Sequence, residues 1–547
     1  MILGRLIFVF LVFSLCRPFS SGGKLSKTQR AMDVHHYDIK IEIDPYKKTI
    51  EGIVGIKFSL RKKVKKIEID LLKTYRVSNA LINEMPMVYS KRGNTIIIDK
   101  KDLDINVLHT LKLTYKGIPP VAKNPPWEGG VTWSESDDGY PWVGLSCQHE
   151  GAYIWFPCKE HPSDKPDSVD IFITVPEPLK VASNGLLEGI KEEEGRKETW
   201  HWKTKNPIST YNINFTIGNF DVITKTAFVK NEKVYMEYYV LPESRYGAEE
   251  FLNKAEKYLS FYSSLFGSYP WLNEKLGLVE TPYLGMEHQT IIAYGNKYKE
   301  TKMGYDALLL HEMGHEWWGN FLSVSDWADF WIPEGFTTYA EALYIEHNFG
   351  LSAYHAFMEN NCRKNIRNDK PLLPGKYATT DQIKGTEFYY KGAYILHMLR
   401  YLVGYDVLIQ TLREYLYTPK SNNNQTNTKE FINYLENNSK MELSWFFNQF
   451  VYSEKLPTLY SKSRSYKNGE KQFVELWWAE PAFPLPVEVQ YKGTYAQEKI
   501  QINIGDKPTG ISIPSGSVLE IDPQKWLLFN NKNFDSIEKN KTRNKIE

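Results

Sequence analysis

The stretch HEMGHEWWGN, residues 311–320, followed by WIPEGF at residues 331–336, decides how this sequence is interpreted. The surrounding run GYDALLLHEMGHEWWGNF has helical periodicity, so His311 and His315, four residues apart, project from one face about a turn apart. Both imidazoles can then bind one cation. Glu312 is offset by one residue, which places its carboxylate beside the metal, where it can act as a base for a water molecule.

A third metal ligand is predicted nineteen residues after His315. Pro333 suits the first position of a helix, so we expect Glu334 in the first turn of the next helix. Two histidines and this carboxylate leave a fourth coordination position open, and a set without cysteine favours zinc, one ion per chain. Glu341, seven residues after Glu334, is either a hydrogen-bond partner of a ligating histidine or an ordinary exposed glutamate.

The N-terminus and the overall charge indicate where the protein acts. The 67 Lys and Arg residues nearly balance the 66 Asp and Glu residues, so nucleic acid is not an expected partner. Arg5 and the apolar run at 6–15 predict a signal peptide over residues 1–22. This run is shorter than the roughly 20 residues of a stable membrane span. We therefore expect an exported protein, periplasmic or secreted, and Leu15 disfavours a lipid anchor at Cys16 because a small residue is expected there.

The pattern of apolar residues changes twice along the chain. Short alternating runs predict a strand-rich domain from about 35 to 225, helical spacing dominates from about 245 to 455, and alternation returns in a small β-sandwich ending near 530. The polar stretch SNNNQTNT at 421–428 is typical of a loop, and residues 533–547 form a charged tail. Without the signal peptide, Cys147, Cys158 and Cys362 allow at most one disulfide, and a Cys147–Cys158 bridge stays open.

HEMGHEWWGN together with WIPEGFTTYAE resembles the M1, or gluzincin, family of zinc aminopeptidases. PISTYNINFTIGNF (207–220), QHEGAYIWFPCKEHP (148–162), YLGMEHQT (283–290) and FYYKGAYILHML (388–399) are similar to further segments of that family. The resemblance implies a multidomain α+β fold with an N-terminal β-saddle (30–225), a thermolysin-like α/β catalytic domain (226–455) and a C-terminal β-sandwich (456–532). Many relatives add a large helical domain, and because only about 90 residues follow residue 455, we expect a short form without it.

The resemblance also implies roles for residues outside the metal set. Glu287, with Gly285 and Met286 in the LGMEH segment, is expected to bind the free amine of a peptide, and Gln148 to face the same amine. Leu284, His288, Tyr153 and Glu160 depart from the family's usual residues around these two segments. The spacing Y-x-K-G selects Tyr389 as the hydrogen-bond donor to the oxyanion, and Tyr283 is expected to line the pocket for the first side chain.

The function implied is hydrolysis of the N-terminal peptide bond of peptides with a free amino terminus. A zinc endopeptidase would share the metal site but would not need Glu287. A catalytically silent peptide-binding homologue is a further alternative, which the presence of Glu312 and Tyr389 disfavours. One branch of the family hydrolyses an epoxide and has a second tyrosine five residues before the position of Tyr389; Lys384 occupies that position and disfavours this activity.

Overall fold

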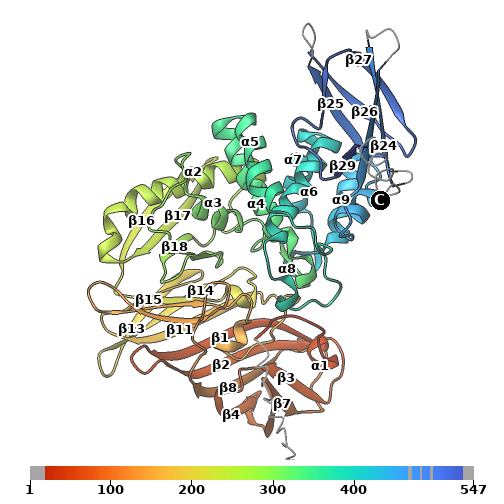
Figure 1. Ribbon diagram of the computed structural model, residues 1–547. Coiled ribbons are helices and arrows are strands. Elements are labelled where there is room, and N and C mark those ends of the chain that lie inside the picture. The colour runs from red at the N-terminus through yellow and green to blue at the C-terminus, as the bar shows by residue number, and fades with distance from the viewer. Residues whose placement is uncertain (1–18, 466–470, 481–482, 493–496, 534–547) are drawn as a thin grey trace, which may run out of the picture.

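The structure is a computed structural model that describes residues 19–465, 471–480, 483–492 and 497–533. Most of the predicted signal peptide and nearly all of the charged tail therefore lie outside the described residues. Figure 1 shows three parts in chain order: a strand-rich N-terminal domain, a mainly helical middle domain and a small C-terminal β domain. The predicted α+β architecture of β-saddle, catalytic domain and β-sandwich is confirmed.

The N-terminal domain is built on an eight-stranded sheet in the order β13-β14-β11-β1-β2-β8-β4-β5. From Tyr37 onward its strand β1 alternates, with Tyr37, Ile39, Ile41 and Ile43 buried while the residues between them are less buried. β1 pairs antiparallel with β2 and parallel with β11, so the N-terminal strand lies in the middle of the sheet. The strands are β1 (Met32–Asp44), β2 (Thr49–Leu60), β4 (Arg76–Ile82), β5 (Met85–Pro86), β8 (His109–Gly117), β11 (Ser168–Pro176), β13 (Leu186–Glu193) and β14 (Lys197–Thr204).

Two smaller sheets complete this domain, one of three strands in the order β3-β7-β6 and one of four in the order β12-β15-β10-β9. The second positions part of the site, because Cys147, Gln148 and His149 follow directly after β10. The elements are α1 (Lys27–Ala31), β3 (Lys66–Asp70), β6 (Tyr89–Arg92), β7 (Thr95–Asp99), β9 (Gly130–Glu135), β10 (Pro141–Ser146), β12 (Lys180–Ser183) and β15 (Phe215–Gly218).

The middle domain combines a five-stranded sheet, in the order β16-β17-β18-β20-β19, with a set of helices. This sheet begins at Asp221, slightly before the expected domain start at residue 226. Its strands are β16 (Asp221–Val229), β17 (Glu232–Val240), β18 (Leu276–Glu280), β19 (Gly285–Met286) and β20 (Ile292–Tyr294). The helices are α2 (Ala248–Phe266), α3 (Ala307–Gly314), α4 (Trp331–Phe349), α5 (Leu351–Phe357), α6 (Glu387–Val403), α7 (Tyr405–Tyr417), α8 (Ser421–Asn424), α9 (Thr428–Ser439) and α10 (Ser444–Phe450).

The polar stretch at 421–428 is not a simple loop. It forms the short helix α8 and the strand β22 (Gln425–Thr426), which pairs in parallel with β21 (Ser323–Val324), and it ends at the start of α9. The Asn424 side chain donates a hydrogen bond of 3.1 Å to the Phe321 carbonyl oxygen. Local polarity predicted a loop, but these contacts with a segment about a hundred residues earlier order the stretch.

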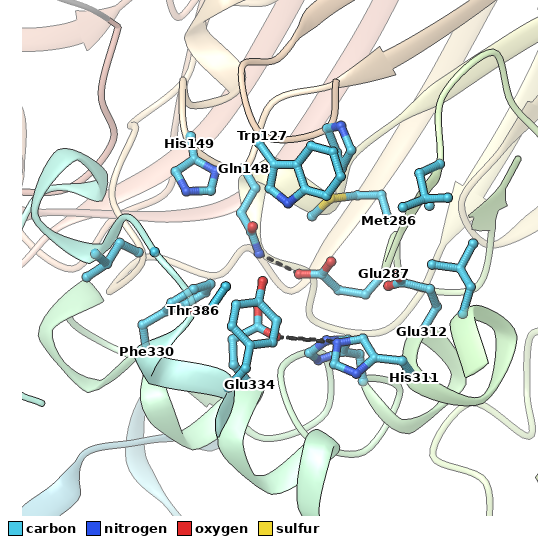
Figure 2. A pocket seen from close by; sticks show the side chains of 18 of the residues that line it. Trp127, Gln148, His149, Met286, Glu287, His311, Glu312, Phe330, Glu334 and Thr386 are labelled. Carbon is cyan, nitrogen blue, oxygen red and sulfur yellow. Dashed lines mark hydrogen bonds and ion pairs between the residues drawn. The ribbon is translucent and has the colours of Figure 1, made fainter. Parts of the chain in front are cut away.

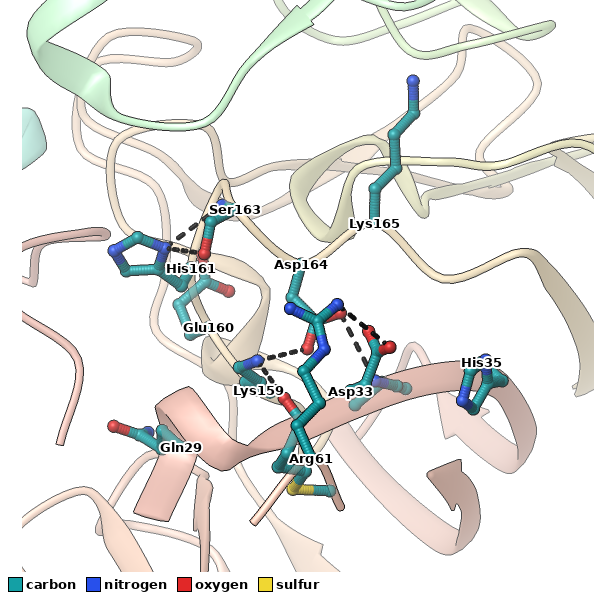
Figure 3. Close-up of polar contacts among 12 residues, drawn as sticks. Gln29, Asp33, His35, Arg61, Lys159, Glu160, His161, Ser163, Asp164 and Lys165 are labelled. Atoms are coloured by element: carbon teal, nitrogen blue, oxygen red, sulfur yellow. Dashed lines mark hydrogen bonds and ion pairs between the residues drawn. The ribbon is translucent and has the colours of Figure 1, made fainter. Parts of the chain in front are cut away.

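Residues 159–165 belong to the N-terminal domain and also contact the catalytic domain (Figure 3). Lys159 and Asp164 form a buried ion pair of 2.7 Å beside the start of β1. Lys165 extends away from that pair, and its Nζ donates to the carbonyl oxygen of Asn320 at 2.6 Å. Burial lowers the pKa of Lys165 to about 7. Because Asn320 follows the HEMGHEWWG segment closely, this contact ties the metal-binding region to the N-terminal domain.

The C-terminal β-sandwich packs on α6 (Figure 1). Trp526 stacks on His397 with ring centroids 4.5 Å apart, and the carbonyl oxygen of Lys525 accepts hydrogen bonds from both the Tyr394 hydroxyl and His397 Nε2. One sheet has the order β27-β24-β23-β29 and the other β26-β25-β28. The strands are β23 (Thr458–Ser465), β24 (Lys471–Trp478), β25 (Pro486–Lys492), β26 (Gln497–Asn503), β27 (Thr509–Pro514), β28 (Val518–Ile521) and β29 (Asn530–Asn533).

The three described cysteines, Cys147, Cys158 and Cys362, are all buried and free, so the possible Cys147–Cys158 disulfide is not formed. Among the described residues, no helix has both the length and the apolar character needed to cross a membrane.

Candidate active site

His311, His315 and Glu334 converge at the junction of α3 and α4. The Nε2 atoms of the two histidines lie 3.0 Å apart, and Glu334 Oε2 lies 3.5 Å from His311 Nε2 and 3.4 Å from His315 Nε2. Within the described part of the chain, the buried Glu334 Oε2 has no hydrogen-bond partner, which is the expected arrangement for an atom that binds a cation. Two imidazoles and one carboxylate, with their ligand atoms all within 4.8 Å of one another, fit a zinc ion.

The two helices differ slightly from the predicted ones. α3 ends at Gly314, and His315 is its C-cap with helical dihedral angles (φ −64°, ψ −21°), so His315 still lies one turn after His311. Beyond it the chain turns, and the amide of Asn320 donates to the His315 carbonyl oxygen. α4 begins at Trp331, which makes Pro333 its third residue, because a 3-10 turn at Trp327–Asp329 leads directly into it. Glu334 lies in the first turn, as expected.

Each metal-binding histidine is oriented through its second ring nitrogen. His311 Nδ1 lies 2.7 Å from Glu341 Oε1, and His315 Nδ1 lies 2.9 Å from the carbonyl oxygen of Trp318. An acceptor at Nδ1 keeps the proton there and leaves Nε2 free to bind a metal. Of the two interpretations of Glu341, the geometry therefore supports the partner of a ligating histidine.

Glu312 faces the cavity beside the metal ligands. Burial raises the pKa of its carboxyl group to about 7, although the nearby His311 acts in the opposite direction. For Glu334, burial raises the pKa, but the charges and hydrogen bonds of the two histidines outweigh this effect and lower it to about 2. A Cβ at Gly285 would lie 3.1 Å from Glu312 Oε1, so this glycine provides the space that Glu312 occupies. Glu334 is thus suited to bind metal and Glu312 to exchange protons.

Glu287 and Gln148 meet on the side of the cavity toward the N-terminal domain (Figure 2). Gln148 Nε2 donates to Glu287 Oε1 at 2.6 Å, and the Tyr211 hydroxyl donates to the same oxygen at 3.1 Å. The Asn320 side chain holds the Glu287 backbone through its carbonyl oxygen. Burial raises the pKa of Glu287. One carboxylate oxygen of Glu287 lies within 4.8 Å of ligand atoms of Glu312 and His315, so this acceptor lies very near the metal ligands.

Tyr389 is placed beside the metal ligands by the close packing of α4 and α6. A Cβ at Gly335 of α4 would lie only 2.6 Å from Gly392 Cα of α6, so the two helices approach at this pair of glycines. The Tyr389 ring stacks on His311, with centroids 5.9 Å apart. Burial, followed by the charge of Glu334, raises the pKa of Tyr389 well above its usual value. The phenol therefore stays protonated and can donate a hydrogen bond.

The cavity between these groups has a volume of about 340 Å³. Of the residues predicted from the sequence, it is lined by Gln148, Gly285, Met286, Glu287, His311, Glu312, His315, Glu334 and Tyr389. The expected position of Tyr283 is not observed, because Tyr283 is not among the described residues that line the cavity. Its hydroxyl donates to the Leu145 carbonyl oxygen at 2.7 Å, and its ring packs against Gly144. A buried backbone acceptor in β10 holds this side chain away from the cavity.

Several lining residues were not predicted, chiefly Trp127, His149, Phe330, Ile383, Thr386 and Tyr390. Trp127 is half exposed and lies over Gln148 in Figure 2, at the side of the cavity that the N-terminal domain provides. His149 follows Gln148 directly, and among the described residues its Nδ1 has no hydrogen-bond partner. The position of His149 next to Gln148 is a sequence signal that could have identified it, whereas the other residues come from separate segments without a shared motif.

The four departures from the family pattern are accommodated. His288 is fully buried, its Nε2 lies 3.0 Å from Asn214 Nδ2, and burial lowers its pKa to about 3, so it stays neutral. Leu284 is partly exposed and lines the cavity. Tyr153 is buried, and Glu160 accepts a hydrogen bond of 2.6 Å from the Ala152 amide. The segments that carry Gln148 and Glu287 are therefore held in place by contacts of the residues that replace the family's usual ones.

Two family models match the chain in succession, the peptidase M1 N-terminal domain over residues 34–212 and the peptidase family M1 domain over residues 250–450. Together they cover more than half of the 547 residues. The chain belongs to peptidase family M1. This confirms the family predicted from HEMGHEWWGN and WIPEGF, and zinc is the cofactor that the family and the ligand set indicate.

Relatives and solved structures of M1 proteins resemble the chain over different lengths. Aminopeptidase 2 of Candida albicans is 24% identical over 416 residues, which is 72% of this chain and 44% of that protein. Glutamyl aminopeptidase of Sus scrofa is 29% identical over 211 residues, 35% of this chain and 21% of that protein. The chain thus spans between about a fifth and about half of the curated relatives it matches.

Among solved structures, an M1 zinc metallopeptidase from Deinococcus radiodurans superposes with a TM-score of 0.66 at 24% identity, covering 78% of this chain and 94% of that one. Aminopeptidase A of Legionella pneumophila superposes with a TM-score of 0.75 at 16% identity, covering 92% of this chain and 60% of that one. At these identities the superpositions show that the M1 fold is shared.

Proposed function

We propose that this M1 protein is a zinc aminopeptidase that removes the first residue from peptides with a free amino terminus. The observation that carries the proposal is the position of Glu287, whose carboxylate accepts from Gln148 and lies within 4.8 Å of ligand atoms of His315 and Glu312. A peptide ammonium bound at Glu287 has room for one residue before the carbonyl that reaches the metal ligands. This geometry supports cleavage of the first peptide bond over an internal one.

The residues around the cavity supply the remaining steps. A zinc ion at His311, His315 and Glu334 would provide Lewis acidity at the scissile carbonyl and acidify water. Glu312, with a pKa of about 7, takes a proton from the attacking water and passes it to the leaving amine. Tyr389 donates a hydrogen bond to the carbonyl oxygen as negative charge develops on it. Glu287 and Gln148 hold the substrate ammonium and so fix which bond is cut.

The proposal also has support from a relative. A mutant of the Deinococcus M1 zinc metallopeptidase has been solved with a bound Tyr-Ser-Ala substrate, and that protein shares the fold of this chain. Of the alternatives, an endopeptidase does not need a buried carboxylate so near the metal ligands, because it binds no substrate ammonium there. A silent binding protein has no use for Glu312 and Tyr389 beside those ligands.

Paired peptides test the proposal. Each peptide is offered with a free and with an acetylated N-terminus, and products are identified by mass spectrometry. Acetylation removes the charge that Glu287 binds and leaves a buried carboxylate without its partner, so rates should fall by about a hundredfold or more. Internal cuts in acetylated peptides, at rates equal to those for the free peptides, would indicate an endopeptidase. Glu287→Ala should lose most of the activity on free peptides while still binding zinc.

We also propose that the protein is exported. The support is Arg5 followed by the apolar run at 6–15 and the small polar residues after it. Expression of the full chain, followed by cell fractionation and sequencing of the protein's N-terminus, tests this. Export predicts a shortened chain outside the cytoplasm, whereas an intact N-terminus in the cytoplasm would contradict it.

A further inference from the structure

Residues Ser20, Ser21, Gly22 and Gly23, called the strap below, lie between the N-terminal domain and the segment that leads to Tyr389. Ser21 is 1% exposed although it precedes the first helix of the chain. Its amide donates to the Thr380 hydroxyl at 3.0 Å, and the Thr380 amide donates back to the Ser21 carbonyl oxygen at 3.1 Å. The Gly23 amide donates to the Ala378 carbonyl oxygen at 2.9 Å. The strap therefore pairs with residues 378–380 much as a short strand would.

The other side of the strap contacts the N-terminal domain. The Ser21 hydroxyl donates to Glu160 Oε1 at 2.7 Å, and His161 Nε2 lies 2.9 Å from the Gly23 carbonyl oxygen. Figure 3 shows Glu160 and His161 side by side in the segment that also carries Lys159 and Asp164. Burial raises the pKa of Glu160, and the hydrogen bond from Ser21 acts in the opposite direction. A buried carboxyl group thus depends on the strap for one of its partners.

The glycine at position 22 permits this close approach. Gly22 has φ +82°, a conformation that glycine adopts without strain. A Cβ at this position would lie 2.3 Å from Trp327 Cδ1 and 2.7 Å from the Ala378 carbonyl oxygen. Trp327 Nε1 in turn donates to the Ser21 hydroxyl at 3.0 Å. The strap is therefore packed closely against residues of both the catalytic domain and the N-terminal domain.

The segment that the strap holds runs directly into the active site. Thr380 begins a 3-10 helix, Thr380–Ile383, and Ile383, Gly385 and Thr386 line the cavity. Thr386 is the N-cap of α6, in which Tyr389 is the third residue. The Thr380 hydroxyl also contacts the carbonyl oxygen of His149, next to Gln148, at 2.5 Å. The segment that begins at Thr380 therefore contacts the Gln148 side of the cavity and also leads to Tyr389 on the other side.

We propose that the strap is a positioning element of the enzyme, which holds residues 378–386 so that Tyr389 is aligned with the scissile carbonyl. Ser21 is accordingly a positioning residue that acts through Tyr389. The proposal requires that any cut during export precede Ser20, which is earlier than the end of the predicted signal peptide at residue 22. This inference rests on the proposed aminopeptidase function.

Ser21→Ala in the full chain tests the inference, with Ser26→Ala as the matched control. Both serines donate their hydroxyl to a glutamate, Ser21 to Glu160 and Ser26 to Glu68, but the contacts of Ser26 lie at the start of α1, away from residues 378–386. We expect Ser21→Ala to lower kcat by about tenfold with little change in KM, since small displacements of a catalytic group reduce the rate strongly. Ser26→Ala should keep the rate of the unaltered enzyme.

Coupling to Tyr389 separates positioning from a general loss of stability. In a Tyr389→Phe background, Ser21→Ala should cause little further loss, because the group through which it acts has been removed. Two results would overturn the inference while leaving the aminopeptidase function intact. One is equal rates for the Ser21→Ala and Ser26→Ala variants. The other is a Ser21→Ala substitution that lowers kcat by the same factor in the Tyr389→Phe background as in the unaltered enzyme.

Hydrogen–deuterium exchange tests the inference without an activity assay. Ser21→Ala keeps the backbone bonds to Thr380 but removes the hydroxyl that anchors the strap to Glu160 and Trp327. Because a strap without these anchors holds the neighbouring segment less firmly, amides of residues 378–386 should exchange faster in Ser21→Ala than in Ser26→Ala. Identical exchange in this segment would refute the positioning role. An unaltered enzyme without peptidase activity would contradict the proposed function instead, and the exchange result would still decide whether the strap holds the segment.

Discussion

Replacing Glu341 with Gln should weaken zinc binding although Glu341 is not a metal ligand. Its Oε1 lies 2.7 Å from His311 Nδ1, and Glu341 is 9% exposed, so the hydrogen bond is charge-assisted and largely shielded from water. An amide is uncharged and offers a weaker acceptor to the imidazole N–H. Hydrogen bonds to charged groups contribute about 1.5–3 kcal/mol. At about 1.4 kcal/mol per tenfold, zinc affinity should fall by between about tenfold and a hundredfold.

Competition with a chromogenic chelator measures this affinity, and activity is assayed with and without excess zinc. The Glu341→Gln variant should lose activity at limiting zinc and regain most of it when zinc is saturating. Glu346→Gln is the matched control, because Glu346 lies on the same helix and pairs with Arg400 at 2.8 Å, remote from His311. The control should lower the melting temperature without changing zinc affinity. Unaltered zinc affinity in Glu341→Gln would refute the reasoning.

Three further outcomes follow from the site and its surroundings. Glu312→Gln should keep zinc, as elemental analysis would show, but reduce hydrolysis by about a thousandfold or more, because an amide is no base; near-normal turnover would contradict this role. Tyr389→Phe should lower kcat by about a hundredfold with little change in KM, and a change confined to KM would argue against oxyanion stabilisation. Lys165 has a pKa of about 7 in the folded protein, below that of an unfolded lysine, so the unfolded chain binds more protons between these values. Melting temperatures should therefore rise from pH 7 to pH 10 relative to Lys165→Met, and parallel curves would refute this.

The sequence alone was sufficient to predict the metal ligands and the order of strand-rich and helical parts, because the spacing of a motif and the periodicity of apolar residues reflect local backbone geometry, whereas the domain folds were implied by the resemblance to the M1 family. A helix places residues four apart on one face, so the spacing of His311 and His315 was sufficient to predict a shared cation. Alternating apolar residues likewise predicted the strands on either side of the helical domain. The departures at helix ends, such as the termination of α3 at Gly314, have a physical reason: caps and turns depend on contacts that periodicity does not encode.

Tertiary structure alone decided the contacts between segments far apart in the chain. Gln148 and Glu287, 139 positions apart, meet because β10 packs against the residues just before β19, and Tyr283 is held away from the cavity by a carbonyl oxygen of β10. The strap is the clearest case, because Ser21 lies in the stretch predicted as a signal peptide and yet bonds to Thr380, 359 positions later. Such contacts form only when two separate parts of the chain fold against each other, and no local pattern in either part specifies them.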